Sequence, residues 1–374
     1  MPVRTEQRPT AAYVDLDAVA RNFHAVKEFV GSDLSYMAVV KANAYGHGLT
    51  PCALRLESEG VDWFGVALPE EGVELREAGI KIPILCLGSF WPGQERLVVE
   101  NELTPVIYQF DIAESLNNYA AEYGLTIDIH VKIDTGMGRV GVHYSDAEDF
   151  ATALGQLENL RIGGLLTHFA AAENPVENEF TELQMVRFAA ACEAFRTAGH
   201  TPEWIDMANS PGAIRHPGSR GNLVRLGGAL YGLLGDILSS DTVGPELEPV
   251  LSLRSKIAHI KKVGPGQSIG YGRTFVTGSE TAIALVPIGY ADGFPRSLSN
   301  CGKVAINGLI APVIGRISMD WTLADVSDIA GVKVGDEVVL IGAEVTAVDI
   351  ARATGTIAYE ITCGLSPRVP RIYE

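Results

Sequence analysis

Short apolar runs alternate with longer amphipathic stretches between about residues 34 and 230. Eight of these runs have the length and composition of buried strands: Tyr36–Lys41, Asp62–Val66, Ile82–Leu87, Thr104–Ile107, Thr126–Ile133, Arg161–Thr167, Glu203–Met207 and Asn222–Leu226. The stretches between most of them have a helical pattern, with expected starts at Thr50-Pro51 and at the capping-box sequence Ser145 to Glu148. Strands that alternate with helices pair in parallel, so the pattern predicts an α/β fold, a (β/α)8 barrel of the TIM type.

The pattern changes near residues 245–249. Beyond them come alternating runs punctuated by glycine, which predict a mainly β C-terminal domain: Ser255–Val263, Thr281–Val286, Lys303–Ile306, Leu309–Ile314 and Glu337–Ile341. Only Thr346–Thr354 has a helical pattern there. We therefore expect a barrel domain over 17–244 and a mainly β domain over 245–374, with a further strand at 11–16.

Composition narrows the function classes. The 374 residues include 47% hydrophobic and 20% charged ones, and the net charge is −17 with a pI of about 4.9. Such acidity disfavours a nucleic-acid or anionic-membrane partner. The five cysteines form no C-x-x-C pair and the histidines show no zinc-protease spacing, so we expect neither disulfides nor a metal. No apolar stretch reaches membrane length and Met1 to Thr10 lacks an apolar segment, so we expect a cytoplasmic protein.

Lys41 is the first candidate for chemistry. It follows the β-branched residues Val39 and Val40, so it should end a buried strand, where desolvation lowers the pKa of an amine. A free amine there can hold an aldehyde cofactor as a Schiff base. A strand-end lysine more often extends its ammonium group into solvent. The next seven residues, which include Tyr45, His47 and two glycines, favour a site instead.

Several other polar residues end predicted barrel strands. Barrel enzymes build their active sites at the carboxyl ends of the strands. The residues expected on this rim, besides Lys41, are Lys132, Asp134, Thr167, His168, Asn209, Ser210 and Arg225. The loops after strands seven and eight commonly hold phosphate, and there Ser210 offers a hydroxyl while Gly227 and Gly228 allow close approach of the backbone.

The segment from Lys132 to Gly141 contains Gly136-x-Gly138-x-x-Gly141, a literal match to the dinucleotide-binding pattern. A lone match is weak, and the barrel periodicity argues against a nicotinamide cofactor.

These motifs together resemble the bacterial alanine racemases, which use pyridoxal 5'-phosphate (PLP). The resemblance extends over nearly the whole chain and rests on residues 39–48, 132–141, 224–228, 268–274, 288–293 and 315–320. It implies that the N-terminal strand 11–16 joins the C-terminal domain. It also implies that PLP is held by Lys41, Tyr45, His168, Asn209, Ser210, Arg225, Gly227, Gly228 and Tyr359, and that Arg139, Met319, Asp320 and Tyr290 contact substrate.

The resemblance also assigns mechanism. Racemisation needs a base on each face of the substrate, here Lys41 and Tyr271, and Tyr271 would reach the cofactor of a partner subunit in a homodimer with shared active sites. A phenol, with an ordinary pKa of about 10, is a poor base unless nearby cations lower that value. Arg225 would face the pyridine nitrogen, which it cannot protonate because arginine stays charged. Its apolar neighbours argue against an alternative role as a strand-end ion pair. Lys132 is a possible carbamylated lysine.

The expected function is therefore a PLP-dependent alanine racemase, an isomerase that interconverts L- and D-alanine and supplies D-alanine for peptidoglycan. Two alternatives remain at this stage. One is an amino-acid racemase of broader specificity on the same scaffold, and the other is a barrel-fold PLP decarboxylase. Decarboxylation has no use for a second base such as Tyr271, and it benefits from an acid where this chain has Arg225.

Overall fold

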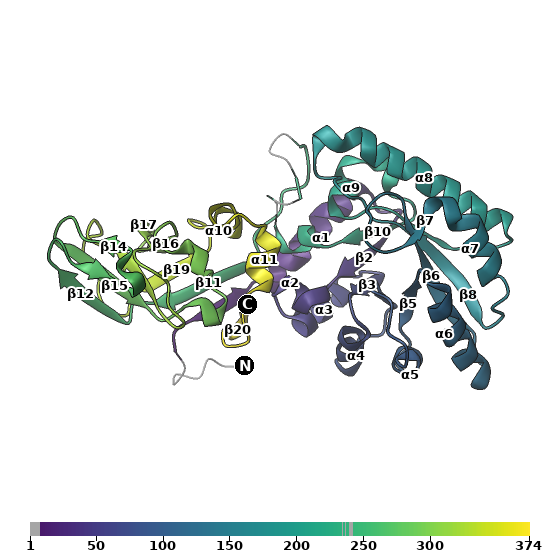
Figure 1. Ribbon diagram of the computed structural model, residues 1–374, viewed down its shortest axis with the longest axis horizontal. Coiled ribbons are helices and arrows are strands. Elements are labelled where there is room, and N and C mark those ends of the chain that lie inside the picture. Colours follow the sequence, from purple (N-terminus) through teal and green to yellow (C-terminus); the bar gives the residue numbers. More distant parts are fainter. Residues whose placement is uncertain (1–7, 234, 236, 239–241) are drawn as a thin grey trace.

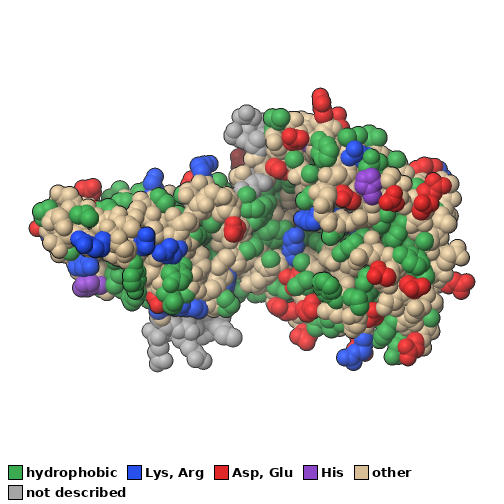
Figure 2. Space-filling view, in the orientation of Figure 1, with side chains coloured by type: hydrophobic (Ala, Val, Ile, Leu, Met, Phe, Trp, Pro, Cys, Tyr) green, Lys and Arg blue, Asp and Glu red, His purple; other side chains and the backbone are tan. Residues whose placement is uncertain are grey.

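The computed structural model describes residues 8–233, 235, 237, 238 and 242–374. The molecule is elongated, with a helix-covered barrel at one end and a mainly β part at the other (Figure 1). Acidic side chains outnumber basic ones over the barrel, whereas basic side chains gather on the β part (Figure 2). On this face the barrel is therefore the more acidic part of the molecule.

Eight parallel strands form the near-closed barrel, in the order β10-β2-β3-β4-β5-β6-β8-β9. They are β2 (Ser35–Val39), β3 (Trp63–Val66), β4 (Ile84–Cys86), β5 (Thr104–Ile107), β6 (Ile127–Asp134), β8 (Leu160–Leu166), β9 (Trp204–Asp206) and β10 (Leu223–Leu226). Backbone contacts draw β9 toward β10, since Arg225 N donates to the Ala208 carbonyl at 2.9 Å. A short strand, β7 (Val142–His143), pairs with β6. The predicted barrel fold is confirmed.

Helices cover the outside of the barrel between successive strands (Figure 1). They are α1 (Leu16–Val30), α3 (Leu49–Ser58), α4 (Pro69–Glu77), α5 (Glu95–Glu100), α6 (Phe110–Glu122), α7 (Ala147–Leu154), α8 (Asn178–Thr197) and α9 (Ser210–Arg215). Two predicted helix starts are wrong. Gly48, not Thr50, is the N-cap of α3. Asp146 precedes α7 without a side-chain cap, because a 3-10 turn occupies Tyr144–Asp146.

The β part contains three sheets. Its strands are β1 (Ala11–Val14), β11 (Leu251–Lys256), β12 (His259–Val263), β13 (Ser268–Ile269), β14 (Phe275–Val276), β15 (Thr281–Val286), β16 (Lys303–Ile306), β17 (Leu309–Pro312), β18 (Thr322–Asp325), β19 (Glu337–Ile341) and β20 (Arg371–Tyr373). Six strands pair in the order β17-β16-β19-β11-β1-β20, three as β12-β15-β18, and β13 pairs with β14. The strand β1 pairs antiparallel with β11 and parallel with β20.

Two expectations for this part are wrong. The run Ser255–Val263 belongs to two strands in different sheets, because the chain breaks its pairing at Ile257 and Ala258. A second helix, α11 (Ala358–Cys363), follows the expected α10 (Ala347–Thr354). The helix α11 contacts α2 (Lys41–Tyr45), the turn that carries Lys41.

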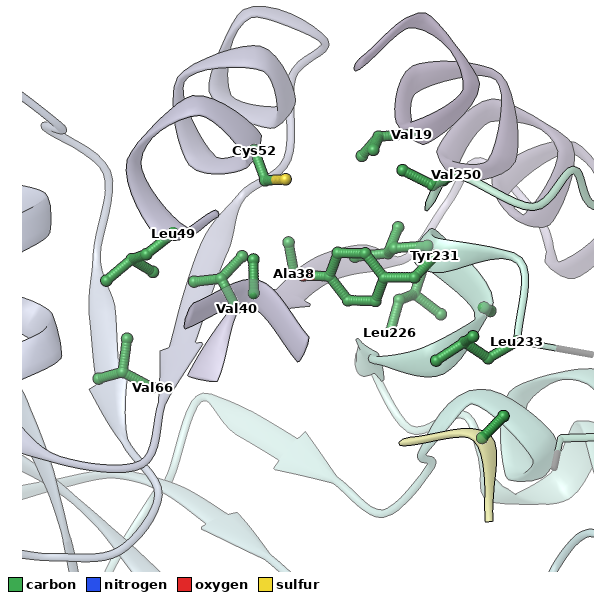
Figure 3. Close-up of a cluster of buried hydrophobic side chains, with 14 of the residues drawn as sticks. Val19, Ala38, Val40, Leu49, Cys52, Val66, Leu226, Tyr231, Leu233 and Val250 are labelled. Atoms are coloured by element: carbon green, nitrogen blue, oxygen red, sulfur yellow. The ribbon is translucent and has the colours of Figure 1, made fainter. Parts of the chain in front are cut away.

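One continuous apolar cluster runs through both parts of the molecule. The portion behind the Lys41 turn joins side chains from the barrel strands, α1, α3 and the segment after β10 (Figure 3). Its labelled members are Val19, Ala38, Val40, Leu49, Cys52, Val66, Leu226, Tyr231, Leu233 and Val250. Burial of this apolar surface is the main favourable term that fixes the turn against the barrel.

Among the residues that the structure describes, no helix has both the length and the apolar character needed to cross a bilayer. The same residues contain no group of histidine, cysteine and carboxylate side chains suited to a metal ion.

Candidate active site

Lys41 opens a turn of unusual backbone conformation. The strand β2 ends at Val39, two residues before the predicted end, and the next residues form α2. Ala42, Asn43, Ala44 and Tyr45 all have φ between 52° and 55°, in the left-handed region. Each non-glycine residue there costs roughly 1–2 kcal/mol, so the surrounding structure must stabilise this turn.

Contacts from distant parts of the chain hold the turn. Glu71 accepts hydrogen bonds from Ala42 N at 2.7 Å and from Ala67 N at 2.8 Å. On the other side, the Arg371 Nε donates to the Gly46 carbonyl at 3.1 Å. Gly48 lies against the end of the chain, since a Cβ there would stand 2.1 Å from the Tyr373 hydroxyl.

The electrostatic setting of Lys41 favours a free amine. Burial lowers the pKa of Lys41, and the charges of Arg139 and Arg225 lower it further, while Glu71 acts in the opposite sense. The amine can therefore act as a nucleophile or a base nearer to neutral pH than an exposed lysine can.

Arg225 lies inside the barrel in a buried ion pair. Its guanidinium is 3% exposed and contacts Asp206, whose side chain is fully buried. The Arg225 Nη2 also donates to the Thr167 carbonyl at 2.8 Å and lies 3.2 Å from His168 Nδ1. The expectation that Arg225 makes no ion pair is wrong, because its partner Asp206 lies on the neighbouring strand β9. Burial and the charge of Arg225 hold the pKa of His168 well below its usual value, so its imidazole is neutral.

Lys132, on β6, lies close enough to Arg225 and Asp206 for their charges to act on it. Its side chain is buried, and burial together with Arg225 lowers its pKa to about 7. Arg139 follows in the loop after β6 and is exposed, close enough for its charge to act on Lys41, Lys132 and His168. The structure thus brings Arg139 and Lys132 to the rim where Lys41 lies.

Two tyrosines and a glycine pair form a cradle beside Lys41. The rings of Tyr45 and Tyr359 are 5.4 Å apart. A Cβ on Gly227 would lie 2.6 Å from the Tyr45 hydroxyl, and one on Gly228 would lie 2.3 Å from the Tyr359 hydroxyl. Gly227 N donates to Ser210 Oγ at 2.9 Å. Only glycine fits at these two positions, and the cradle gathers the hydroxyl and amide donors that suit a phosphate group.

Three further residues position the groups of the site, and of these only Asn209 was predicted from the sequence. Asn209 caps α9, because its side chain accepts from Gly212 N at 3.0 Å. Sequence reasoning missed Glu71 and Asp206, since Glu71 lies in a helix and Asp206 lies within a strand predicted only for its apolar pattern. A carboxylate inside a buried strand was the available signal for Asp206.

The remaining predicted residues lie on the β part. Tyr271, in a turn between β13 and β14, is 71% exposed, and Figure 1 places β14 at the far end of the β part from α2. Tyr290 and Met319 are also exposed, and their loops are joined, since Tyr290 N donates to the Ser318 carbonyl at 3.1 Å. Asp320 pairs with Arg368 at 2.7 Å. Tyr271 therefore lies apart from the Lys41 of its own chain.

The carboxyl rim of this (β/α)8 barrel carries a half-buried amine, a charged network and a cradle suited to phosphate. These features define a barrel enzyme with its active site on that rim. Family models for the alanine racemase N-terminal and C-terminal domains match residues 14–235 and 250–373. The chain belongs to the alanine racemase family, whose members are amino-acid racemases and hence isomerases.

Individual relatives agree over the full length. An alanine racemase of Geobacter sulfurreducens is 44% identical over 376 residues, covering 98% of both chains. The solved alanine racemase of Clostridium difficile 630 superposes with a TM-score of 0.93 at 38% identity, covering 99% of this chain and 97% of its own. The alanine racemase of Bartonella henselae, solved with covalently bound pyridoxal phosphate, has a TM-score of 0.90 at 28% identity, covering 98% of this chain and 100% of its own.

Proposed function

We propose that this chain interconverts L- and D-alanine with PLP as cofactor, in the cytoplasm, and that it supplies D-alanine for peptidoglycan. The observation that carries the proposal is the half-buried, partly desolvated amine of Lys41 at the carboxyl end of the barrel strands. A barrel domain over 17–244 and a β domain over 245–374 joined by 11–16 are the units that combine in this activity.

The residues beside Lys41 fit the cofactor. Lys41 would hold its aldehyde carbon, and Tyr45, Tyr359, Ser210 and the Gly227 region would hold its phosphate. Burial raises the pKa of Tyr45, so its phenol stays protonated and able to donate. When bound, PLP supplies an electron sink that stabilises negative charge at the substrate Cα.

Arg225 sets the charge at the centre of the barrel. Its guanidinium stays protonated at any working pH, so it donates hydrogen bonds and cannot accept a proton from the cofactor. The Asp206 carboxylate fixes the orientation of Arg225 from below. With arginine rather than an acid facing the ring nitrogen, the cofactor would be a weaker electron sink, which would favour quick return of the proton to the substrate Cα.

Two bases exchange the proton at the substrate Cα. The Lys41 amine serves one face, and the Tyr271 hydroxyl serves the other. The Arg139 guanidinium binds the substrate carboxylate. Lys132 supports Arg139 as a carbamate, a role favoured by its pKa of about 7, because the neutral amine is the form that adds CO2 with loss of a proton.

The second base comes from a partner subunit. Tyr271 is exposed on the β part, and Tyr290 and Met319 present further exposed surface there. A homodimer in which each β part covers the other barrel rim would complete two sites. The contrast between the acidic barrel and the more basic β part favours this pairing (Figure 2).

Hydrogen exchange at Cα tests the proposal. In deuterated water the protein should exchange the α-proton of both alanine enantiomers and should be yellow from bound PLP. Tyr271→Phe should slow exchange of L-alanine by about a hundredfold or more, the scale of a lost general base, while exchange of D-alanine falls much less. Tyr123→Phe, a surface phenol on the barrel that is 58% exposed, is the matched control. Equal loss for both enantiomers would contradict the assignment of Tyr271 to one face.

A further inference from the structure

A large cavity opens at the end of the barrel opposite Lys41. Its volume is about 820 Å3, within the range of small-molecule sites. The lining residues lie at the amino ends of the parallel strands, including Trp63 on β3, Asp128 on β6, Arg161 on β8 and Trp204 on β9. We call this region the barrel mouth. It lies at the opposite end of the barrel from Lys41, so binding there is independent of the proposed function.

Aromatic rings form the floor of the barrel mouth. The Trp63 and Trp204 rings meet edge to face with centroids 5.8 Å apart, and the His130 ring lies 5.3 Å from Trp63. Trp63 is 7% exposed, whereas Trp204 is half-buried. Indole faces attract cations through the ring quadrupole, more strongly where water is excluded.

His130 contributes a buried polar atom that no described residue satisfies. Its side chain is 1% exposed and lines the cavity, and its Nδ1 has no hydrogen-bond partner among the described residues. The chain makes room for the ring by placing glycine at 164, where a Cβ would lie 2.5 Å from His130 Cε1. Burial lowers the pKa of His130 to about 4, so the imidazole is neutral and offers one acceptor nitrogen. A buried acceptor of this kind is suited to a donor from a ligand.

The rim of the barrel mouth carries excess negative charge. Glu102, Glu158 and Glu203 make no ion pair within the part of the chain that the structure describes. The cations are mostly occupied, because Arg161 pairs with Asp128 and the Arg76 guanidinium donates to backbone carbonyls. Lys81 is the remaining exposed cation of this lining. A cationic ligand therefore gains from the rim, while an anion meets repulsion.

We propose that the barrel mouth binds a protonated organic amine that carries an apolar group. The ammonium lies near Glu158 and Glu203 over the indole of Trp204, and its N–H is directed to His130. The apolar group packs against Trp63.

Calorimetry on the PLP-bound protein tests this with the N,N-dimethylbenzylammonium ion. This tertiary amine keeps one N–H for His130 and cannot form a Schiff base with the cofactor. It should bind with a dissociation constant in the millimolar range or tighter. Benzyl alcohol and benzoate, the neutral and anionic counterparts, should bind at least several-fold more weakly. Binding should persist in saturating alanine, because the barrel mouth is opposite the Lys41 rim.

Variants distinguish direct binding by the glutamates of the barrel mouth from a general effect of the protein's net charge. Glu203→Gln and Glu158→Gln should each weaken binding about three- to fivefold, the scale of one cation contact at a partly exposed site. Glu148→Gln, on the exposed first turn of α7, is the control and should leave binding unchanged. Benzoate binding as tightly as the amine, displacement of the amine by alanine, or equal effects of Glu203→Gln and Glu148→Gln would each overturn the proposal.

Discussion

Lys132 links the stability of the molecule to pH. Its pKa falls from 10.5 to about 7 on folding, so between these values the unfolded chain binds a proton that the folded chain does not. The free energy of unfolding should therefore rise with pH from about 7 to 10.5. Lys132→Met should flatten this rise, as measured by urea unfolding in CO2-free buffer. Lys333→Met, at an exposed lysine, is the control, and a rise that survives unchanged in Lys132→Met would contradict the linkage.

Asp206 and Arg225 should behave unlike a surface ion pair. Removal of one partner of a buried pair leaves an uncompensated charge, so Asp206→Asn should lower the free energy of unfolding by about 3 kcal/mol. Glu193→Gln removes the exposed pair with Arg196 and should have no measurable effect. Chemical denaturation of the three proteins distinguishes the cases, and a similarly small loss in both variants would show that Arg225 finds other partners.

For single residues, the sequence predicted positions in the fold better than it predicted contact partners. Lys41 could be placed just after a barrel strand, and Arg225 near the end of one, because the apolar runs locate the ends of the strands. The ion pair with Asp206 could not be predicted, since contacts between neighbouring strands depend on register. For the same reason, the hydrogen bond that Ala42 N donates to Glu71 could not be predicted.

At the scale of an element, the strain of the left-handed turn α2 can be tested by substitution. Ala42 is exposed with a φ of 53°, where glycine is more stable than alanine. Ala42→Gly should therefore keep or raise the free energy of unfolding, by up to about 1 kcal/mol. Ala121→Gly, at an exposed position in the right-handed helix α6, should lower it by about 1 kcal/mol. Urea unfolding compares them, and losses of equal size would contradict a strained turn.

Elements were predictable where their pattern is local. Most barrel strands have an apolar run bounded by turn residues, so periodicity located them within a few residues. The turn α2 was not predictable, because alanine and asparagine at positive φ carry no sequence signal and are held there by Glu71 and Arg371. The helix α11 was missed because six residues are too few to show a helical period.

The whole molecule should be active only as a dimer that shares its sites. Lys41→Ala and Tyr271→Phe proteins should each fail to racemise alanine alone, and should recover racemisation when unfolded together and refolded as a mixture. Random pairing gives heterodimers with one intact site, so activity should approach about a quarter of the unmodified level.

Two controls define this experiment. Each single variant refolded alone should not racemise alanine. A chain that carries both Lys41→Ala and Tyr271→Phe, refolded with unmodified protein, should give no more activity than the unmodified protein supplies by itself. No recovery in the mixture of single variants, despite dimers in size-exclusion chromatography, would place Tyr271 at the site of its own chain.

The contact of Arg371 with Gly46 joins residues 325 positions apart. Tyr373 also packs against Gly48, so the strand β20 holds the Lys41 turn in place. The ribosome synthesises β20 long after the barrel strands. The barrel can collapse around its strands as they emerge, yet the turn is locked only when residues 371–373 leave the exit tunnel. A chain that ended before residue 371 would contain every proposed catalytic residue. It would still lack the contacts of Arg371 and Tyr373 that hold the Lys41 turn.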